Sequence, residues 1–196
     1  MKQRPMQYDQ APTAQQVQAE LDRERYKLRY RRTLRSTLFT LLCAAAAAVL
    51  VATLWLPVLQ IYGSSMTPTL SEGEIVLSWK SADFRPGDIV AFYYGNSLLI
   101  KRYIAGPGSW VDIREDGTVL VDGTPLDEPY LSEKALGSCD SELPYQVPEG
   151  RYFLLGDHRA TSVDSRHTAV GCIAKEQIVG KVLYRVWPLS ALGAVR

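Results

Sequence analysis

Two side chains in this sequence could together perform nucleophilic chemistry, a serine and a lysine. Ser65 lies in residues 63–70 (GSSMTPTL), where Pro68 lacks a backbone donor and should prevent a helix from continuing. Lys101 directly follows residues 97–100 (SLLI), part of an apolar strand-like stretch. Burial in such surroundings lowers the pKa of a lysine, and the neutral amine can then accept the proton of a serine hydroxyl. The pattern therefore predicts a Ser-Lys pair.

Residue types alone leave two other assignments open. Residues 156–166 (GDHRATSVDSR) form a second polar turn that contains His158, and His167 follows it directly. A Ser-His-Asp arrangement with Ser65 as the nucleophile is therefore possible. Lys101 could also extend its amine from a strand to solvent, as most strand lysines do. It would then keep its charge and would not act on the serine.

A long apolar segment precedes the serine turn. Residues 38–59 contain no charged residue over 22 positions, and a helix needs about 20 apolar residues to cross a bilayer. Residues 1–36 carry nine Lys/Arg and four Asp/Glu, a net charge of +5, whereas residues 37–196 carry a net charge of −4. A cleaved signal peptide is the alternative, but its apolar core usually spans only about 7–15 residues.

These patterns predict three regions. Residues 1–36 form a basic cytoplasmic tail that is partly helical, and residues 37–59 form a single helix across the cell membrane. Residues 60–196 form an extracytoplasmic domain, because basic residues flank a transmembrane helix on its cytoplasmic side. The tail would contact anionic head groups of the lipid bilayer. The mildly acidic domain argues against binding to nucleic acid.

The domain after the apolar segment alternates apolar, β-branched stretches with turn signals such as Arg-Pro-Gly at 85–87 and Glu-Asp-Gly at 115–117. The predicted strands cover residues 74–79, 88–94, 98–104, 110–114, 118–122, 152–155 and 181–187. Residues 127–150 form a long excursion without an assigned role. The predicted fold class is mainly β, with an antiparallel β-sheet domain carried on a single N-terminal transmembrane helix.

The cysteines and histidines do not form a metal-binding pattern. The chain has three cysteines and two histidines, and it contains no Cys-x-x-Cys, so we expect neither a metal nor another cofactor. Cys139 and Cys172 lie in the domain predicted to be extracytoplasmic, where a disulfide between them would be stable. Two free thiols are the alternative.

Four stretches resemble, in order, the motifs of the type I signal peptidases, which are Ser-Lys leader peptidases. They are residues 65–70 (SMTPTL), 87–92 (GDIVAF), 101–108 (KRYIAGPG) and 156–166, and the resemblance extends over about residues 35–190. It implies the β-sheet catalytic domain of the signal-peptidase type. It also implies a serine endopeptidase that removes signal peptides from exported preproteins, cutting after small residues in an Ala-x-Ala-like site.

The resemblance also implies roles for individual residues. Ser65 would attack the substrate carbonyl and form an acyl-enzyme, with Lys101 as the general base. Ser162 would hydrogen-bond the lysine amine and orient it. Asp164 and Arg166 would form a supporting ion pair behind that serine.

Three positions depart from the family pattern. Gly63 stands where some members have a serine that completes the oxyanion hole, so the second donor beside the Ser65 backbone N–H would be Ser64 or a water. His158 stands where Asn is common, and Ser109 where Asp is common. None of the three positions belongs to the expected Ser-Lys pair.

We expect the substrate to bind as an extended strand. It would pair with the chain near Gln60, Ile61 and Tyr62 on one side and near Leu99 and Ile100 on the other. Shallow apolar pockets would select small residues at the first and third positions before the cut. We expect the protein to act as a monomer.

Two further functions are compatible with the same features. One is a Ser-Lys protease that cuts a single dedicated client. The other is a non-catalytic, membrane-anchored domain that binds exported peptides, although such a domain has no need of both Ser65 and Lys101.

Overall fold

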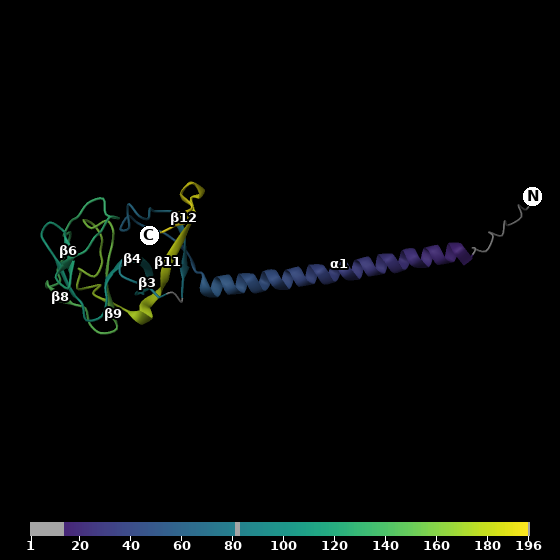
Figure 1. Ribbon diagram of the computed structural model, residues 1–196, viewed down its shortest axis with the longest axis horizontal. Coiled ribbons are helices and arrows are strands. Elements are labelled where there is room, and N and C mark those ends of the chain that lie inside the picture. The colour runs from purple at the N-terminus through teal and green to yellow at the C-terminus, as the bar shows by residue number, and fades with distance from the viewer. Residues whose placement is uncertain (1–13, 81–82, 196) are drawn as a thin grey trace, which may run out of the picture. The chain divides into compact units, whose positions relative to one another are not determined.

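The computed structural model describes residues 14–80 and 83–195 (Figure 1). The first 13 residues of the predicted basic tail lie outside this part of the chain. The chain divides into two compact units, residues 1–50 and residues 51–196.

A single helix, α1 (Ala14–Trp55), accounts for the described part of the first unit and ends in the second. Figure 1 shows it as one continuous helix. Its 42 residues correspond to a length of about 63 Å at 1.5 Å per residue, roughly twice the hydrocarbon thickness of a bilayer. The charged part of the predicted tail from residue 14 onward therefore belongs to the same helix as the apolar segment. The helix contains no buried residue, and it is long and apolar enough to cross a membrane.

The helix ends earlier than the sequence predicts. The transmembrane segment was expected to reach residue 59, but α1 ends at Trp55 and strand β1 begins at Val58. Pro57 lies between them, and proline disfavours helical backbone in the residue before it. Because β1 pairs with β2, its residues join the sheet of the second unit.

The second unit contains two antiparallel sheets. The eight-stranded sheet has the order β1-β2-β11-β3-β4-β9-β10, with β12 paired to β11. Its strands are β1 (Val58–Gln60), β2 (Ile75–Trp79), β3 (Ile89–Tyr94), β4 (Ser97–Ala105), β9 (Arg151–Leu155), β10 (Ile173–Ala174), β11 (Ile178–Trp187) and β12 (Gly193–Ala194). The four-stranded sheet has the order β7-β6-β5-β8, with β5 (Trp110–Ile113), β6 (Val119–Val121), β7 (Thr124–Pro125) and β8 (Tyr145–Gln146).

Two short 3-10 helices, η1 (Lys175–Gln177) and η2 (Leu189–Ala191), flank β11. The predicted fold class is confirmed, since every strand pairing is antiparallel and one long helix precedes the sheets. All seven predicted strands are present with small shifts of their ends. The strands that the sequence did not predict are the short ones, β1, β7, β8, β10 and β12.

Two of the open strand edges in the large sheet belong to β1 and β4. Strand β1 pairs only with β2, so its other edge has no partner strand in the described chain. Strand β4 pairs with β3 along residues 97–102, but its pairing with β9 begins only at Arg102. The first half of β4 therefore also has one free edge.

The serine turn is anchored in the core beneath these edges. Met66 and Leu70 are buried in one cluster with Leu59, Ile61 and other side chains of the large sheet. The Leu70 N–H donates to the Met66 carbonyl over 2.8 Å, which closes one turn of backbone. Apolar side chains on this turn thus fix it against the sheet.

Candidate active site

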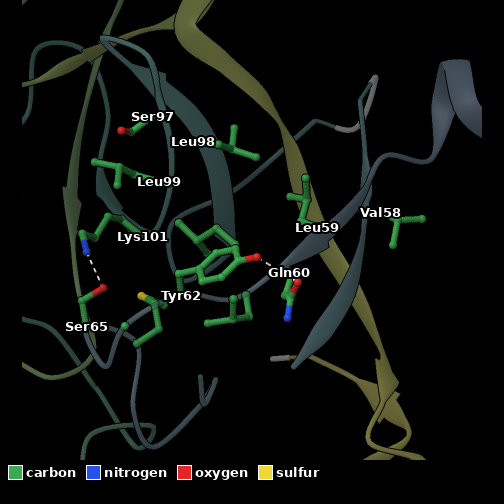
Figure 2. A pocket seen from close by; sticks show the side chains of 13 residues that line it. Val58, Leu59, Gln60, Tyr62, Ser65, Ser97, Leu98, Leu99 and Lys101 are labelled. Atoms are coloured by element: carbon green, nitrogen blue, oxygen red, sulfur yellow. Dashed lines mark hydrogen bonds between the residues drawn. The ribbon is translucent and has the colours of Figure 1, made fainter. Parts of the chain in front are cut away.

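Ser65 and Lys101 are in direct contact. Lys101 Nζ donates a hydrogen bond to Ser65 Oγ over 2.6 Å (Figure 2). The serine comes from the turn after β1, and the lysine comes from the middle of β4. Lys101 is only 4% exposed, and within the described chain it forms no ion pair. Burial lowers the pKa of Lys101 to about 8, even though the charge of Asp164 opposes the shift.

The second polar turn packs directly against the serine. The His158 backbone N–H donates to the Ser65 carbonyl over 3.0 Å. A Cβ atom at Gly156 would lie 2.5 Å from that carbonyl and 2.1 Å from Ser162 Oγ. The close approach of the two turns therefore requires glycine at this position.

Asp164 and Arg166 form the predicted ion pair. Arg166 Nε donates to Asp164 Oδ1 and Nη2 donates to Oδ2, each over 2.9 Å, and both side chains are fully buried. The Gly156 N–H donates to Asp164 Oδ2 over 3.0 Å, which ties the pair to the tightly packed glycine. Burial alone would raise the pKa of Asp164, but the hydrogen bonds and charge of Arg166 hold it below its usual value.

The expected hydrogen bond between Ser162 and the lysine amine is absent, which corrects that prediction. Ser162 is buried, and its Oγ has no hydrogen-bond partner in the part of the chain that the structure describes. Ser162 Oγ lies against Gly156, where an added Cβ would come within 2.1 Å of it, while Lys101 Nζ donates to Ser65 Oγ. Ser162 instead contributes its carbonyl, which accepts from Arg166 Nη2 over 3.2 Å.

A second buried ion pair lies next to the lysine in the chain. Arg102 Nε and Nη2 donate to Asp157 Oδ1 and Oδ2 over 2.8 and 2.6 Å, and Nη1 donates to the Gly87 carbonyl over 2.6 Å. Thr69 Oγ1, from the end of the serine turn, donates to Asp157 Oδ2 over 2.5 Å. The pair thus links β4 to the serine turn.

The excursion at residues 127–150 covers the buried arginines. Glu128 pairs with Arg159, and the Tyr130 ring lies 3.7 Å from the Arg102 guanidinium carbon. The Leu136 carbonyl accepts a hydrogen bond from Arg166 Nη1. Each of the three arginines is therefore contacted by this excursion.

A groove of about 560 Å³ runs beside the serine and lysine. In Figure 2, Ser65 and Lys101 lie on one side of the view and Val58 lies on the other. All five predicted substrate-binding residues line the groove, and they are Gln60, Ile61, Tyr62, Leu99 and Ile100. The two free strand edges of β1 and β4 therefore border one cavity.

Comparison with known proteins identifies the family. The family profile described as "Signal peptidase, peptidase S26" matches residues 34–187. A signal peptidase IB of Staphylococcus aureus (strain Mu50 / ATCC 700699) is 38% identical over 150 residues, which cover 66% of this chain and 77% of that protein. This chain belongs to the signal peptidase S26 family. It is therefore a serine peptidase.

Two further relatives are named signal peptidase I. A signal peptidase I of Bacillus licheniformis is 36% identical over 143 residues, covering 66% of this chain and 76% of that protein. A crystal structure of a signal peptidase I from Enterococcus faecalis V583 is 29% identical, covers 51% of this chain and 97% of its own, and has a TM-score of 0.42.

The alternative bases in this signal peptidase homologue do not contact the serine hydroxyl. His158 Nδ1 is hydrogen-bonded to Thr161 Oγ1, and His167 Nδ1 accepts from the Asp164 N–H over 3.4 Å. Ser64 is exposed, and its carbonyl accepts from the Thr67 hydroxyl over 2.7 Å.

The possible disulfide is not formed, which corrects that prediction. Cys139 and Cys172 are both free thiols. Cys172 is buried in a core cluster with Ile104 and Phe153, and burial raises its pKa to about 11. Cys139 instead donates weakly to the Ser141 carbonyl over 3.7 Å. The two sulfurs therefore serve different local contacts.

Several supporting residues could not be assigned from the sequence. Asp157, Glu128 and Tyr130 lie far in sequence from the arginine that each contacts. The one available signal was the adjacency of Lys101 and Arg102 in an apolar strand. Two successive cations on a strand point to opposite faces, so Lys101 and Arg102 must each have their own set of contacts.

Proposed function

We propose that this protein is a membrane-anchored endopeptidase that removes N-terminal signal peptides from exported preproteins with a Ser65-Lys101 dyad. The observation that carries the proposal is the 2.6 Å contact between Lys101 Nζ and Ser65 Oγ beside the groove. A lysine pKa near 8 leaves about a tenth of the amine neutral at pH 7, and that fraction can accept a proton.

The acylation step follows from this geometry. In the neutral form of Lys101 the hydrogen bond reverses, so that the Ser65 hydroxyl donates to the amine. Ser65 Oγ attacks the scissile carbonyl while its proton moves to Lys101 Nζ. The resulting ammonium then protonates the leaving amine, the C–N bond breaks, and an acyl-enzyme remains.

Deacylation uses the same base a second time. Lys101 takes a proton from an incoming water as that water attacks the ester at Ser65. The resulting ammonium then returns the proton to Ser65 Oγ, the ester C–O bond breaks, and the acid product leaves with the free serine restored. The Ser65 backbone N–H would stabilise the oxyanion in both steps. Ser64 or a water would supply the second donor. Asp164, Arg166 and Ser162 act behind the lysine, by fixing the turn that packs on the serine.

The substrate would add one strand between two free edges. The Ile61 N–H and carbonyl are bonded to Glu74 and Gly73, so the alternate residues Gln60 and Tyr62 direct their backbone groups to the open side of this chain segment. Residues 97–100 have a free edge on the other side of the groove. An extended peptide can satisfy both sets of groups, as in β-augmentation. Side chains of the substrate that point to the groove wall would meet Ile61, Tyr62, Leu99 and Ile100, which favours small residues before the cut.

The membrane topology is part of the proposal. The apolar half of α1 would span the cell membrane, with the basic tail in the cytoplasm and the catalytic domain outside, because basic residues concentrate before the apolar segment. From Trp55 to Ser65 the chain has only ten residues, at most about 35 Å when extended. A monomer would thus hold its nucleophile near the bilayer surface, where a signal peptide ends.

The test is cleavage of a secretory preprotein by the purified full chain in detergent. We expect the parent to cut at the signal-peptide junction, and Ser65→Ala and Lys101→Met each to lower kcat by at least about 10³-fold, because both act on the same proton. Lys181→Met is a matched control, since this lysine lies in the same sheet and forms an ion pair outside the groove. Retained activity in Lys101→Met would assign the base elsewhere.

A library of cleavage-site peptides tests the specificity. We expect Ala, Gly or Ser at the first and third positions before the cut. A preference for large residues at these positions would contradict strand docking in this groove. Cleavage of a single preprotein out of a varied panel would favour the dedicated-client alternative.

A further inference from the structure

The serine turn is also held from a strand outside the sequence motifs. Arg185 Nη2, on β11, donates a hydrogen bond to the Thr69 carbonyl over 2.6 Å. The Thr69 side chain is bound separately, because its hydroxyl donates to Asp157. Thr69 is therefore held at two points. Asp157, in the second polar turn, binds its side chain, and Arg185, on β11, binds its main chain.

Arg185 is itself oriented by a buried carboxylate. Arg185 Nε lies 3.0 Å from Glu74 Oε2, an ion-pair contact in which neither of these two atoms forms a hydrogen bond. Glu74 is 8% exposed, and its carbonyl accepts from the Ile61 N–H over 2.8 Å. The Glu74–Arg185 pair thus connects the wall of the groove to the end of the serine turn.

Three contacts together fix where Ser65 Oγ lies. The His158 N–H holds the Ser65 carbonyl, Asp157 holds the Thr69 hydroxyl, and Arg185 holds the Thr69 carbonyl. Thr69 lies inside the backbone turn that the Leu70 N–H closes on the Met66 carbonyl, and Met66 directly follows the serine, so a movement of Thr69 is transmitted to Ser65. A misplacement of about 1 Å at reacting groups can cost on the order of 100-fold in rate.

We propose that Arg185, oriented by Glu74, is a positioning residue that holds the serine turn in register with Lys101. This inference rests on the proposed function of Ser65 and Lys101 and adds a residue that the four motifs do not contain. Arg185 does not line the groove. Its loss should therefore change the chemical step more than substrate binding.

The experiment measures kcat and KM of the full chain on one preprotein. We expect Arg185→Met to lower kcat by about 10- to 100-fold with KM within about twofold. Arg185→Lys should recover at least a third of the parent kcat, because it restores a cation that can donate to the carbonyl. Lys181→Met should leave both constants within about twofold. Lys181 lies on the same strand, pairs with Asp88 over 2.7 Å, and is similarly exposed.

A double variant, Glu74→Gln with Arg185→Met, controls for the buried carboxylate that Arg185→Met alone leaves unpaired. We expect it to unfold at a temperature closer to the parent's and still to show the low kcat. A parent-like kcat in the double variant would overturn the proposal, and so would an equal loss of kcat in Lys181→Met. If Ser65→Ala keeps its activity, the proposed function itself fails. If Ser65→Ala is inactive and Arg185→Met is fully active, only the positioning role fails.

Discussion

Each face of β4 buries one cation, but the contacts that surround the two cations differ. Lys101 and Arg102 are adjacent, and both are almost fully buried. Lys101 contacts a hydroxyl and has no ion-pair partner in the described chain, so burial lowers its pKa to about 8. Arg102 has a bidentate carboxylate, a backbone carbonyl and an aromatic ring around it.

Under the proposed function, this contrast lets one strand supply both a base and a scaffold. A cation becomes a base when its charge is left uncompensated, because desolvation then favours the neutral form. A cation becomes a structural link when a carboxylate compensates it, and arginine suits that use since it does not lose its proton. The choice of partner decides the role of each residue, more than burial does.

Removing Arg102, whose charge is compensated by Asp157, should have the largest effect on stability. Arg102→Met leaves Asp157 buried without its partner, and such a loss costs about 3–5 kcal/mol. We expect the thermal midpoint of the full chain in detergent to fall by roughly 10 °C. The double variant with Asp157→Asn should recover part of the loss. A midpoint within about 2 °C of the parent's in Arg102→Met would show that the pair contributes little.

Removing Lys101, the cation without an ion-pair partner among the described residues, should raise the stability of the protein, whereas removing Arg102 should lower it. The pKa of Lys101 is about 8 in the folded protein and about 10.4 in an unfolded chain, so below pH 8 its burial costs about 3 kcal/mol. Lys101→Met should therefore be inactive yet more stable than the parent at pH 7. The cost disappears as pH rises from 8 to 10.5, since the unfolded chain then binds more protons than the folded one. Equal unfolding temperatures of parent and variant at pH 7 and pH 10 would contradict this.

The pH dependence of the reaction sharpens the same comparison. We expect kcat/KM to rise about tenfold per pH unit below pH 8 and to level off above it, because in the proposed mechanism only the neutral amine of Lys101 accepts the serine proton. The measurement is kcat/KM for one peptide between pH 6 and pH 10. A midpoint near 6.5 would instead indicate a histidine base.

The smallest effect is expected at the ring beneath Arg102. Tyr130→Leu removes the cation–π contact and the hydrogen bond from the Tyr130 hydroxyl to Glu128, for a loss of about 1–2 kcal/mol. Tyr93→Leu, at an exposed tyrosine, is a control that should change stability by less than about 0.5 kcal/mol. Thermal unfolding of the two variants decides whether the excursion stabilises the arginine.

Much of the architecture could be predicted from local patterns. The strands of five or more residues carry enough β-branched and apolar residues to be recognised, and so does the apolar part of α1. Strand β1 could not be separated from the helix, because Val58–Gln60 continue the same uncharged run. Hydropathy does not distinguish a residue in lipid from one in a buried strand.

The candidate site likewise contains some residues that could be predicted from the sequence and others that could not. The pairing of Ser65 with Lys101 could be predicted, but only from the resemblance of four ordered stretches to one family, because the residue types alone left a histidine base and a solvent-exposed lysine open. The absent contact of Ser162 and the pairing of Glu128 with Arg159 could not, since they depend on long-range packing. Arg185 gave no local signal at all, because it lies in an ordinary strand and acts through a backbone carbonyl.

The open edges of β1 and β4, which border the same groove, have a consequence for when a client can be cleaved. In the proposed mode of docking, the groove binds only a client whose cleavage region still lacks its own hydrogen-bonded structure. Once the mature protein folds up to the junction, those backbone groups are taken and the groove is closed to it. Under the proposed function, cleavage therefore has to precede folding of the client at the junction, and slowly folding clients or long unstructured junctions would leave the longest time for cleavage.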